Sequence, residues 1–220
     1  MNSRTTTHSR IALVTGANKD VGHAIARQFA TLPATVYLGA RDTSRGQNAA
    51  NASRRHLGIS TPWHAPSQTP ADDMRQSFET NVLGYITVTN TMLPLLRHSE
   101  AARIVNISSV IGSLTAAAEN HDPTGAFPDG GFPNTLGYPV SKAAVNALTI
   151  MYANERRTDG ILVNAVSPNW VPTDANGHSG LLTLEQGALL PVKMATLPDG
   201  GPTGTFTCSD ATGEGLTLPW

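Results

Sequence analysis

The chain has 220 residues, which suits one domain with a sizeable core, and it is 40% apolar and 14% charged, a globular rather than a disordered composition. Its net charge of -1 argues against nucleic acid or an anionic membrane surface as the main partner. A lone cysteine, Cys208, the polar first ten residues and the lack of any apolar run near the ~18 residues of a membrane helix together predict a cytoplasmic protein.

Strand and helix signals alternate along the sequence. Short apolar runs predict strands at residues 10–15, 34–40, 102–110, 161–170 and 203–208. Helical spacing predicts helices at residues 22–30, 44–56, 69–99, 138–157 and 184–197, with Thr69 or Pro70 opening the longest one. A Gly- and Pro-rich stretch, residues 119–137, is expected to be an extended loop. This alternation predicts one α/β domain of the Rossmann-like type: a mostly parallel sheet between two helical layers.

Five short motifs occur in a fixed order at the predicted strand ends and helix starts: TGANKDVG, NVLG, VNISS, YPVSK and NAVSPNWVPTD. A glycine turn or a YxxxK pair alone is a weak signal. Together, the five motifs resemble the short-chain dehydrogenase/reductase family, and within it the NADP-dependent carbonyl reductases with a TGANKGIG-like loop. The resemblance implies hydride transfer between a nicotinamide cofactor and a carbonyl or alcohol, and pairing into homodimers or homotetramers through the two longest helices.

The resemblance assigns four catalytic positions. Tyr138 would exchange a proton with the reacting oxygen, and Lys142, one helical turn later, would favour the phenolate and bind the cofactor's ribose. Ser109 would donate a hydrogen bond to the carbonyl oxygen, whereas Ser108 is the better candidate for a structural bond. Asn81 would complete a proton relay behind Lys142. Each could singly be a packing, capping or surface residue; their joint order favours catalysis.

The cofactor positions follow from the same motifs. An arginine at the end of the second strand accommodates the 2′-phosphate of NADP, and Arg41 stands there. Lys19 in the glycine turn matches a second basic residue that contacts this phosphate in the family subgroup, so the two residues predict NADP(H) in preference to NAD(H). No histidine or cysteine spacing predicts a metal site. The full set of expected cofactor contacts is Gly16, Asn18, Lys19, Asp20, Val21, Gly22, Arg41, Tyr138, Lys142, Pro168, Asn169, Val171 and Thr173. Asn169 stands where the family has glycine, which is a mild departure because asparagine tolerates left-handed backbone.

Asp20 is a larger departure, because it replaces the middle glycine of the family's phosphate loop. A carboxylate ~5 Å from a phosphate, at an effective dielectric of ~20, costs roughly 3 kcal/mol, or about a hundredfold in affinity. Lys19 could offset part of this cost. Alternatively, Asp20 could turn outward and cap the helix start.

A second departure is an apparent internal deletion. The family's strand–crossover–strand unit of roughly 30 or more residues has no counterpart between residues 56 and 58, and one of its strands belongs beside the first strand in mid-sheet. Three outcomes stay open: residues 56–61 enter the vacant slot, the remaining strands close ranks, or the chain folds poorly. We therefore divide the domain into a truncated cofactor-binding half, residues 1–57, and a catalytic half, residues 58–220. The alternatives are an NADP(H)-dependent oxidoreductase and a catalytically impaired relic or oligomerisation module.

Overall fold

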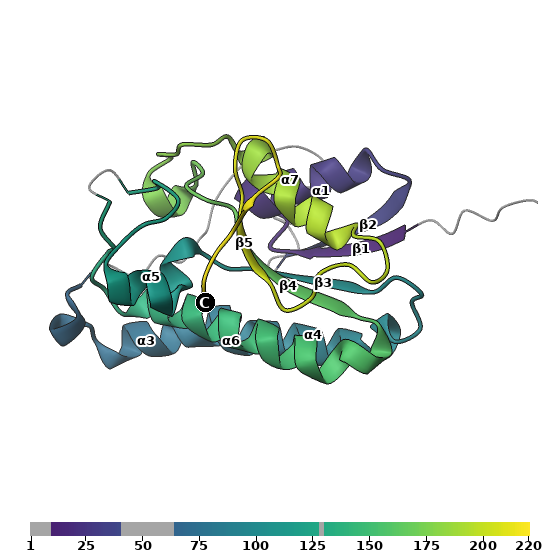
Figure 1. Cartoon of the computed structure of the whole chain (residues 1–220), viewed down its shortest axis with the longest axis horizontal. Coiled ribbons are helices and arrows are strands. Elements are labelled where there is room, and N and C mark those ends of the chain that lie inside the picture. The colour runs from purple at the N-terminus through teal and green to yellow at the C-terminus, as the bar shows by residue number, and fades with distance from the viewer. Residues whose placement is uncertain (1–9, 41–63, 128–129) are drawn as a thin grey trace, which may run out of the picture.

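The computed structural model describes residues 10–40, 64–127 and 130–220, and everything below refers to these residues. Helices α1 (Asp20–Ala30) and α7 (Leu184–Ala195) lie on one side of the strands in Figure 1. Helices α3 (Ala71–Phe78), α4 (Gly84–Leu96) and α6 (Gly137–Arg156) lie on the other side. The expected three-layer Rossmann-like arrangement is confirmed. No helix in the described part of the chain has the length and apolarity needed to cross a bilayer.

The described strands form two separate sheets. Strand β1 (Arg10–Thr15) pairs in parallel with β2 (Ala34–Gly39) and with no other described strand. The second sheet has the order β3-β4-β5-β6, in which the first three strands are parallel and the last is antiparallel. Its strands are β3 (Arg103–Ile107), β4 (Leu162–Ser167), β5 (Phe206–Cys208) and β6 (Leu216–Thr217).

The split lies where the sequence predicts a lost strand. Because β1 and β3 do not pair, the possibility that the remaining strands close ranks is wrong. The helical layer bridges the split instead: Ile25 and Phe29 of α1 pack with Ala188 of α7, and Ile107 of β3 contacts the same cluster. The proposed replacement strand, residues 56–61, and the predicted helix 44–56 lie outside the described residues.

The loss also uncovers one face of the β1–β2 ribbon. Side chains alternate along a strand, so Ala12 and Val14 face α1 while Ile11 and Leu13 face the opposite way. Ile11 is 73% exposed, and Tyr37 on β2 is 57% exposed. A parallel strand needs cover on both faces, and among the described residues β1 packs only on its α1 side.

The longest predicted helix is continuous but not uniform. It begins after Pro70, as α3, passes through the π-helical turn η2 (Glu79–Leu83), and ends as α4. Two short elements were not predicted: α5 (Leu114–Glu119), which the η3 turn (Val110–Gly112) precedes, and the edge strand β6.

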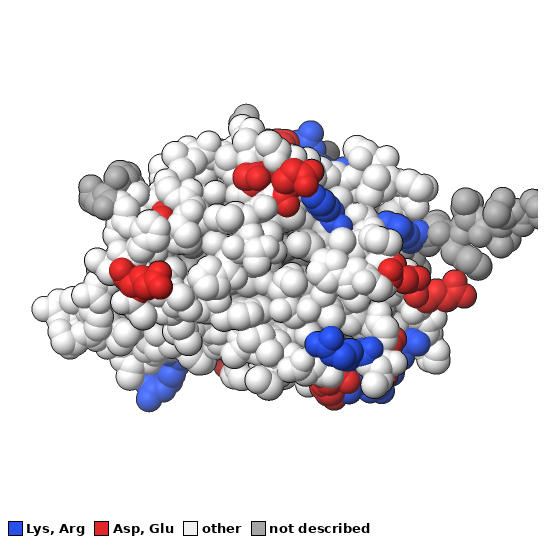
Figure 2. All heavy atoms as spheres, in the orientation of Figure 1, with Lys and Arg blue, Asp and Glu red and all other residues white. Residues whose placement is uncertain are grey.

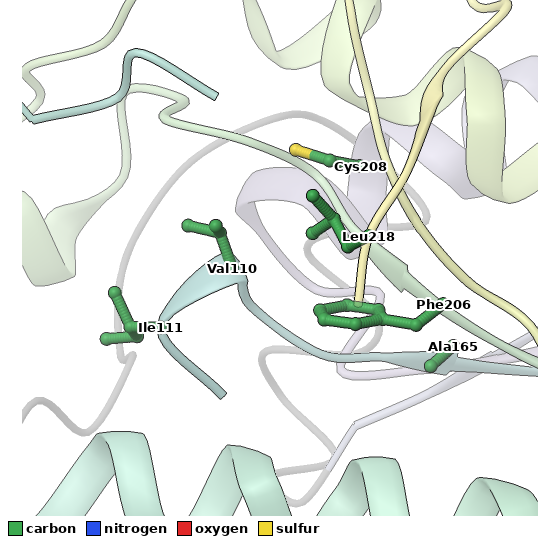
Figure 3. Close-up of a cluster of buried hydrophobic side chains, with 6 residues drawn as sticks. All are labelled: Val110, Ile111, Ala165, Phe206, Cys208 and Leu218. Atoms are coloured by element: carbon green, nitrogen blue, oxygen red, sulfur yellow. The ribbon is translucent and has the colours of Figure 1, made fainter. Parts of the chain in front are cut away.

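The main core lies between the second sheet and the C-terminal segment. Figure 3 shows Val110 and Ile111 from η3 near Leu218, Phe206 and Cys208, and all of them are buried. Burial raises the pKa of the Cys208 thiol to about 12, so this cysteine is a core residue, as its position in an apolar strand predicts.

Candidate active site

Tyr138 and Ser109 meet at the carboxyl end of the second sheet. Tyr138 is the second residue of α6, and Ser109 follows β3 in extended backbone before η3. The Ser109 side chain lies close enough to Tyr138 to influence the ionisation of its phenol. Burial raises the pKa of the Tyr138 hydroxyl to about 12, and the Ser109 side chain opposes that rise. The phenol is therefore a held, protonated group in the cofactor-free protein.

Lys142 lies beside this phenol, one turn further along α6. Its Nζ is 5.4 Å from the centre of the Tyr138 ring, and the residue is 6% exposed. Burial lowers the pKa of the Lys142 ammonium to about 8, because the charged form loses its water. The ammonium donates a hydrogen bond to the Ile107 carbonyl at 2.8 Å.

Asn81 also contacts helix α6, through the side chain of Ser141. It sits in the π-helical turn η2, where the extra residue per turn redirects its side chain. Its Nδ2 donates to Ser141 Oγ at 3.0 Å, and Ser141 Oγ donates to the Tyr138 carbonyl at 2.7 Å. The structure therefore brings Asn81 to the backbone of the Tyr138 turn, where its side chain bonds Ser141 rather than Lys142.

Ser108 differs from Ser109 in its surroundings. Ser108 is buried, and its hydroxyl donates to Asn146 Oδ1 at 2.6 Å, which ties β3 to the middle of α6. Asn146 Nδ2 in turn donates to the Gly112 carbonyl at 3.0 Å. Ser109 is only half-buried and faces Tyr138.

The glycine turn after β1 keeps its backbone form. Gly16 has φ +62°, a left-handed conformation that favours glycine, and the Ala17 N–H donates to the Gly39 carbonyl of β2 at 3.1 Å. A Cβ on Gly22 would lie 2.5 Å from the Gly16 carbonyl oxygen, so only glycine lets α1 start this close to the turn. Asn18 and Val21 are half-buried, and Val21 packs on the α1–α7 cluster.

The charged part of the turn is altered. Asp20 has φ +45°, so a non-glycine residue occupies a left-handed position. Its carboxylate lies 3.1 Å from Lys19 Nζ, and the same Nζ lies 3.1 Å from Asp174 Oδ2 in the segment after β4. Asp174 Oδ1 lies 3.1 Å from His178 Nε2. We call Lys19, Asp20 and Asp174 the ion cluster; it has a net charge of -1.

This cluster decides between the two sequence interpretations of Asp20. Asp20 is the first residue of α1, after the N-cap Lys19, and that N-cap position carries no side-chain cap bond. The outward capping alternative is therefore wrong, because the Asp20 side chain pairs with Lys19. The Lys19 ammonium does offset the Asp20 charge, but it also pairs with the Asp174 carboxylate.

The segment after β4 carries the remaining cofactor positions. Asn169 has φ +67°, as its replacement of glycine predicts, and its Nδ2 and Oδ1 bind the Ser209 carbonyl and the Trp170 N–H at 3.0 and 2.7 Å. Pro168 and Val171 are buried under Gly187 of α7, where a Cβ would lie 2.5 Å from Val171 Cγ1. The Thr173 N–H donates to Asn176 Oδ1 at 3.0 Å.

An aromatic wall stands beside Tyr138. The Phe127 ring packs edge-on against Trp170, with ring centres 5.5 Å apart, and the Phe132 ring centre lies 6.3 Å from that of Phe127. Phe127, Phe132 and Tyr138 all pack against the main core cluster. Beyond Trp170, an open hollow of about 400 Å³ is lined by Pro172, His178 and residues 180–185. Phe127 and Phe132 belong to the Gly- and Pro-rich loop, residues 119–137, whereas Trp170 and the residues that line the hollow follow β4.

One predicted cofactor position lies outside the described residues, and three features of the site were not predicted from the sequence. Arg41 lies outside the described residues. Sequence analysis missed Tyr85, which contacts Lys142, although an aromatic residue four positions after Asn81 shares its helix face and could have signalled it. It also missed Ser141 and the pairing of Asp174 with Lys19. No group of residues suited to hold a metal occurs in the described ranges.

Comparisons with known proteins identify the family of the chain. A sequence profile described as "Enoyl-(Acyl carrier protein) reductase" matches residues 55–212, more than half of the chain. "Carbonyl reductase [NADPH] 3" of Homo sapiens is 30% identical over 263 residues, covering 86% of this chain and 92% of that protein. The chain belongs to the short-chain dehydrogenase/reductase family.

A plant member of the family shows what this chain lacks. "Short-chain dehydrogenase/reductase 1" of Saponaria officinalis is 29% identical over 285 residues, covering 90% of this chain and 93% of that protein. That aligned length exceeds the 220 residues of the chain, so the relative has residues with no counterpart here. The solved NADPH-bound carbonyl reductase from chicken fatty liver aligns with a TM-score of 0.74 at 24% identity, over 96% and 99% of the two chains, which shows the shared fold.

Proposed function

We propose that the protein is an NADP(H)-dependent oxidoreductase that interconverts a carbonyl and an alcohol. The observation that carries the proposal is the triple of Ser109, Tyr138 and Lys142: a buried phenol with a serine hydroxyl beside it and an ammonium 5.4 Å from the centre of its ring. Membership of a family whose relatives include NADPH carbonyl reductases supports the same chemistry. We treat residues 1–57 as its cofactor-binding half and residues 58–220 as its catalytic half.

The three side chains divide the work of carbonyl reduction. The hydride for the carbonyl carbon would come from NADPH when it is bound. The Ser109 hydroxyl donates to the carbonyl oxygen and stabilises the negative charge that develops there. Tyr138 delivers its proton to that oxygen, which completes the alcohol. The Lys142 ammonium stabilises the phenolate that remains, and Asn81 supports the turn of α6 on which both residues stand.

The residues present fit the cofactor in part. The glycine turn has the backbone form of a phosphate loop, and its N–H groups open a helix whose N-terminus favours anions. The ion cluster opposes this, because its net charge of -1 repels a diphosphate. Lys142 and Thr173 would hold the ribose and the nicotinamide end. The preference for NADP(H) over NAD(H) rests on Lys19 and Arg41 in the sequence.

The second candidate is a relic with weakened cofactor binding. Two observations favour it: the left-handed Asp20 in the phosphate loop, and the separation of β1–β2 from the second sheet. Titration with NADPH, followed by protein fluorescence, separates the candidates. Saturable binding followed by turnover of a ketone or quinone supports the enzyme. Absence of binding at millimolar NADPH overturns it.

Self-association is part of the proposal. Apolar side chains are exposed on both of the long helices expected to form the interface: Leu83, Val88 and Leu95 on one, and Val140 and Met151 on α6. Charged groups of both signs are scattered over the face in Figure 2, with uncharged surface between them. We propose a homodimer or homotetramer in the cytoplasm that acts on a small molecule, not on a membrane or nucleic acid. Sedimentation of the purified protein tests the oligomeric state.

A further inference from the structure

The ammonium of Lys142 has a partner that the proposed chemistry does not use. Its Nζ lies 5.7 Å from the centre of the Tyr85 ring and 5.4 Å from the centre of the Tyr138 ring, so one cation stands near two aromatic faces. Tyr85 is the second residue of α4, whereas Tyr138 and Lys142 both belong to α6. Tyr85 is therefore the aromatic contact that a different helix brings to the lysine.

Tyr85 and Lys142 also share a hydrogen-bond acceptor. The Tyr85 hydroxyl and the Lys142 ammonium each donate to the Ile107 carbonyl, both at 2.8 Å. A carbonyl oxygen has two lone pairs and can accept both bonds. This common acceptor fixes the hydroxyl, the ammonium and the last residue of β3 relative to one another.

The Ile107 carbonyl is available because of the split sheet. Alternate residues of a parallel strand direct their backbone groups to opposite edges. The Ser108 N–H donates to the Val166 carbonyl of β4, so Ile107, one residue earlier, faces the other edge of β3. No strand within the described residues pairs with that edge. A buried carbonyl needs a donor, and two side chains provide one here.

We propose that Tyr85 is a positioning residue that holds the Lys142 ammonium beside Tyr138, with its ring as a cation–π partner and its hydroxyl as the second donor to Ile107. This inference rests on the proposed function, in which Lys142 must stay charged and close to the phenol. Tyr85 itself does not exchange a proton. Burial, and next the neighbouring Tyr138, raises the pKa of its hydroxyl, so the hydroxyl remains a donor.

The two parts of Tyr85 act on the lysine in opposite directions. The ring attracts the cation and favours the charged form, whereas the hydroxyl competes with the ammonium for Ile107. The titratable groups against the ammonium are Tyr85 from α4 and Tyr138 from α6, and the contact from β3 is a backbone carbonyl. Removing the ring should therefore lower the pKa of Lys142, and removing only the hydroxyl should not.

The test is an NMR titration of the cofactor-free protein carrying ¹³Cε-labelled lysine. The chain has three lysines, Lys19, Lys142 and Lys193, so the spectrum is simple and Lys142→Arg assigns the signal. In Tyr85→Leu the midpoint for Lys142 should fall by about 0.5 to 1 pKa unit. In Tyr85→Phe it should equal or exceed that of the parent protein.

A matched control is available on the same pair of helices. Tyr152 of α6 donates a hydrogen bond to Asn90 Oδ1 of α4 at 2.8 Å, but it lies ten residues, or about 15 Å, from Lys142 along the helix. Tyr152→Leu should leave the Lys142 midpoint unchanged. Equal shifts in Tyr85→Leu and Tyr152→Leu, or no shift in Tyr85→Leu, would overturn the proposal. If the leucine variant does not fold, a lowered midpoint in Tyr85→Phe overturns it.

Kinetic measurements give a second test, because loss of packing alone would not produce the following pattern of changes in kcat, KM and the pH profile. For carbonyl reduction, Tyr85→Leu should lower kcat about tenfold and move the alkaline limb of the pH profile down with the NMR midpoint, while KM for the carbonyl stays unchanged. Tyr85→Phe should restore kcat to near the parent value. The NMR result is independent of cofactor binding: an unmoved midpoint defeats this inference, whereas failure to bind NADPH defeats the proposed function.

Discussion

Strands β4 and β1 are both parallel strands of one domain, yet every residue of β4 is buried, whereas four of the six residues of β1 are exposed. β4 has β3 and β5 as neighbours and helices on both faces, while β1 pairs with β2 alone among the described strands and packs on the α1–α7 cluster. The loss of a crossover unit can therefore disturb one part of a Rossmann-like fold and leave the packing of the rest intact. The groups that we propose as catalytic depend on β3, β4 and α6, which pair and pack with one another. The phosphate loop depends on β1.

The largest effect is expected in the catalytic half. Tyr138→Phe keeps the ring that packs on the core but removes the proton donor, so kcat for carbonyl reduction should fall by about 100- to 10,000-fold. The loss of NADPH absorbance measures the rate. NADPH affinity serves as the control and should change less than about threefold. Retention of more than a tenth of the rate would show that Tyr138 is not the acid.

The phosphate loop should respond in the opposite sense. Asp20→Gly removes a repelling carboxylate and a left-handed non-glycine residue, so NADPH should bind about ten- to a hundredfold more tightly. Asp20→Asn keeps the size of the side chain and separates charge from backbone strain; it should recover most of the gain. Titration calorimetry measures both. Weaker binding in either variant would mean that the Asp20 carboxylate holds Lys19 in a useful place.

Stability should differ between the two sheets. Val163 in β4 is fully buried, so Val163→Ala should lower the free energy of unfolding by about 2 kcal/mol. Ile11 in β1 is 73% exposed, so Ile11→Thr should cost less than about 0.5 kcal/mol. Urea unfolding measures both values. A cost at Ile11 equal to that at Val163 would show that the outer face of β1 is covered in solution.

The pH dependence should report Lys142. Its pKa is lowered to about 8, so the ammonium is present below that pH and is lost as the pH rises through it. The kcat/KM for NADPH reports ionisations of the cofactor-free enzyme and should fall about tenfold per pH unit above about pH 8. An alkaline limb that begins only near pH 10 would contradict a buried, partly desolvated lysine.

Short sequence motifs predict much of the fold and of the candidate site. The order of strands and helices, the left-handed Asn169, and the meeting of Ser109 with Tyr138 follow from motifs at the ends of adjacent parallel strands. The pairing of Lys19 with Asp174 does not, because 155 residues separate them and no motif links them. Tyr85 was missed for a similar reason: its proposed role depends on the Ile107 carbonyl, with which no strand among the described residues pairs, and no motif marks that carbonyl.

The most direct test of this account is the division of effects between kcat and KM in Asp20→Gly. If the cofactor-binding half is weakened while the catalytic half is intact, KM for NADPH should fall about tenfold or more, and kcat at saturating NADPH should stay within about twofold of the parent enzyme. A changed kcat with an unchanged KM for NADPH would contradict the account, because the defect would then lie in the catalytic geometry itself.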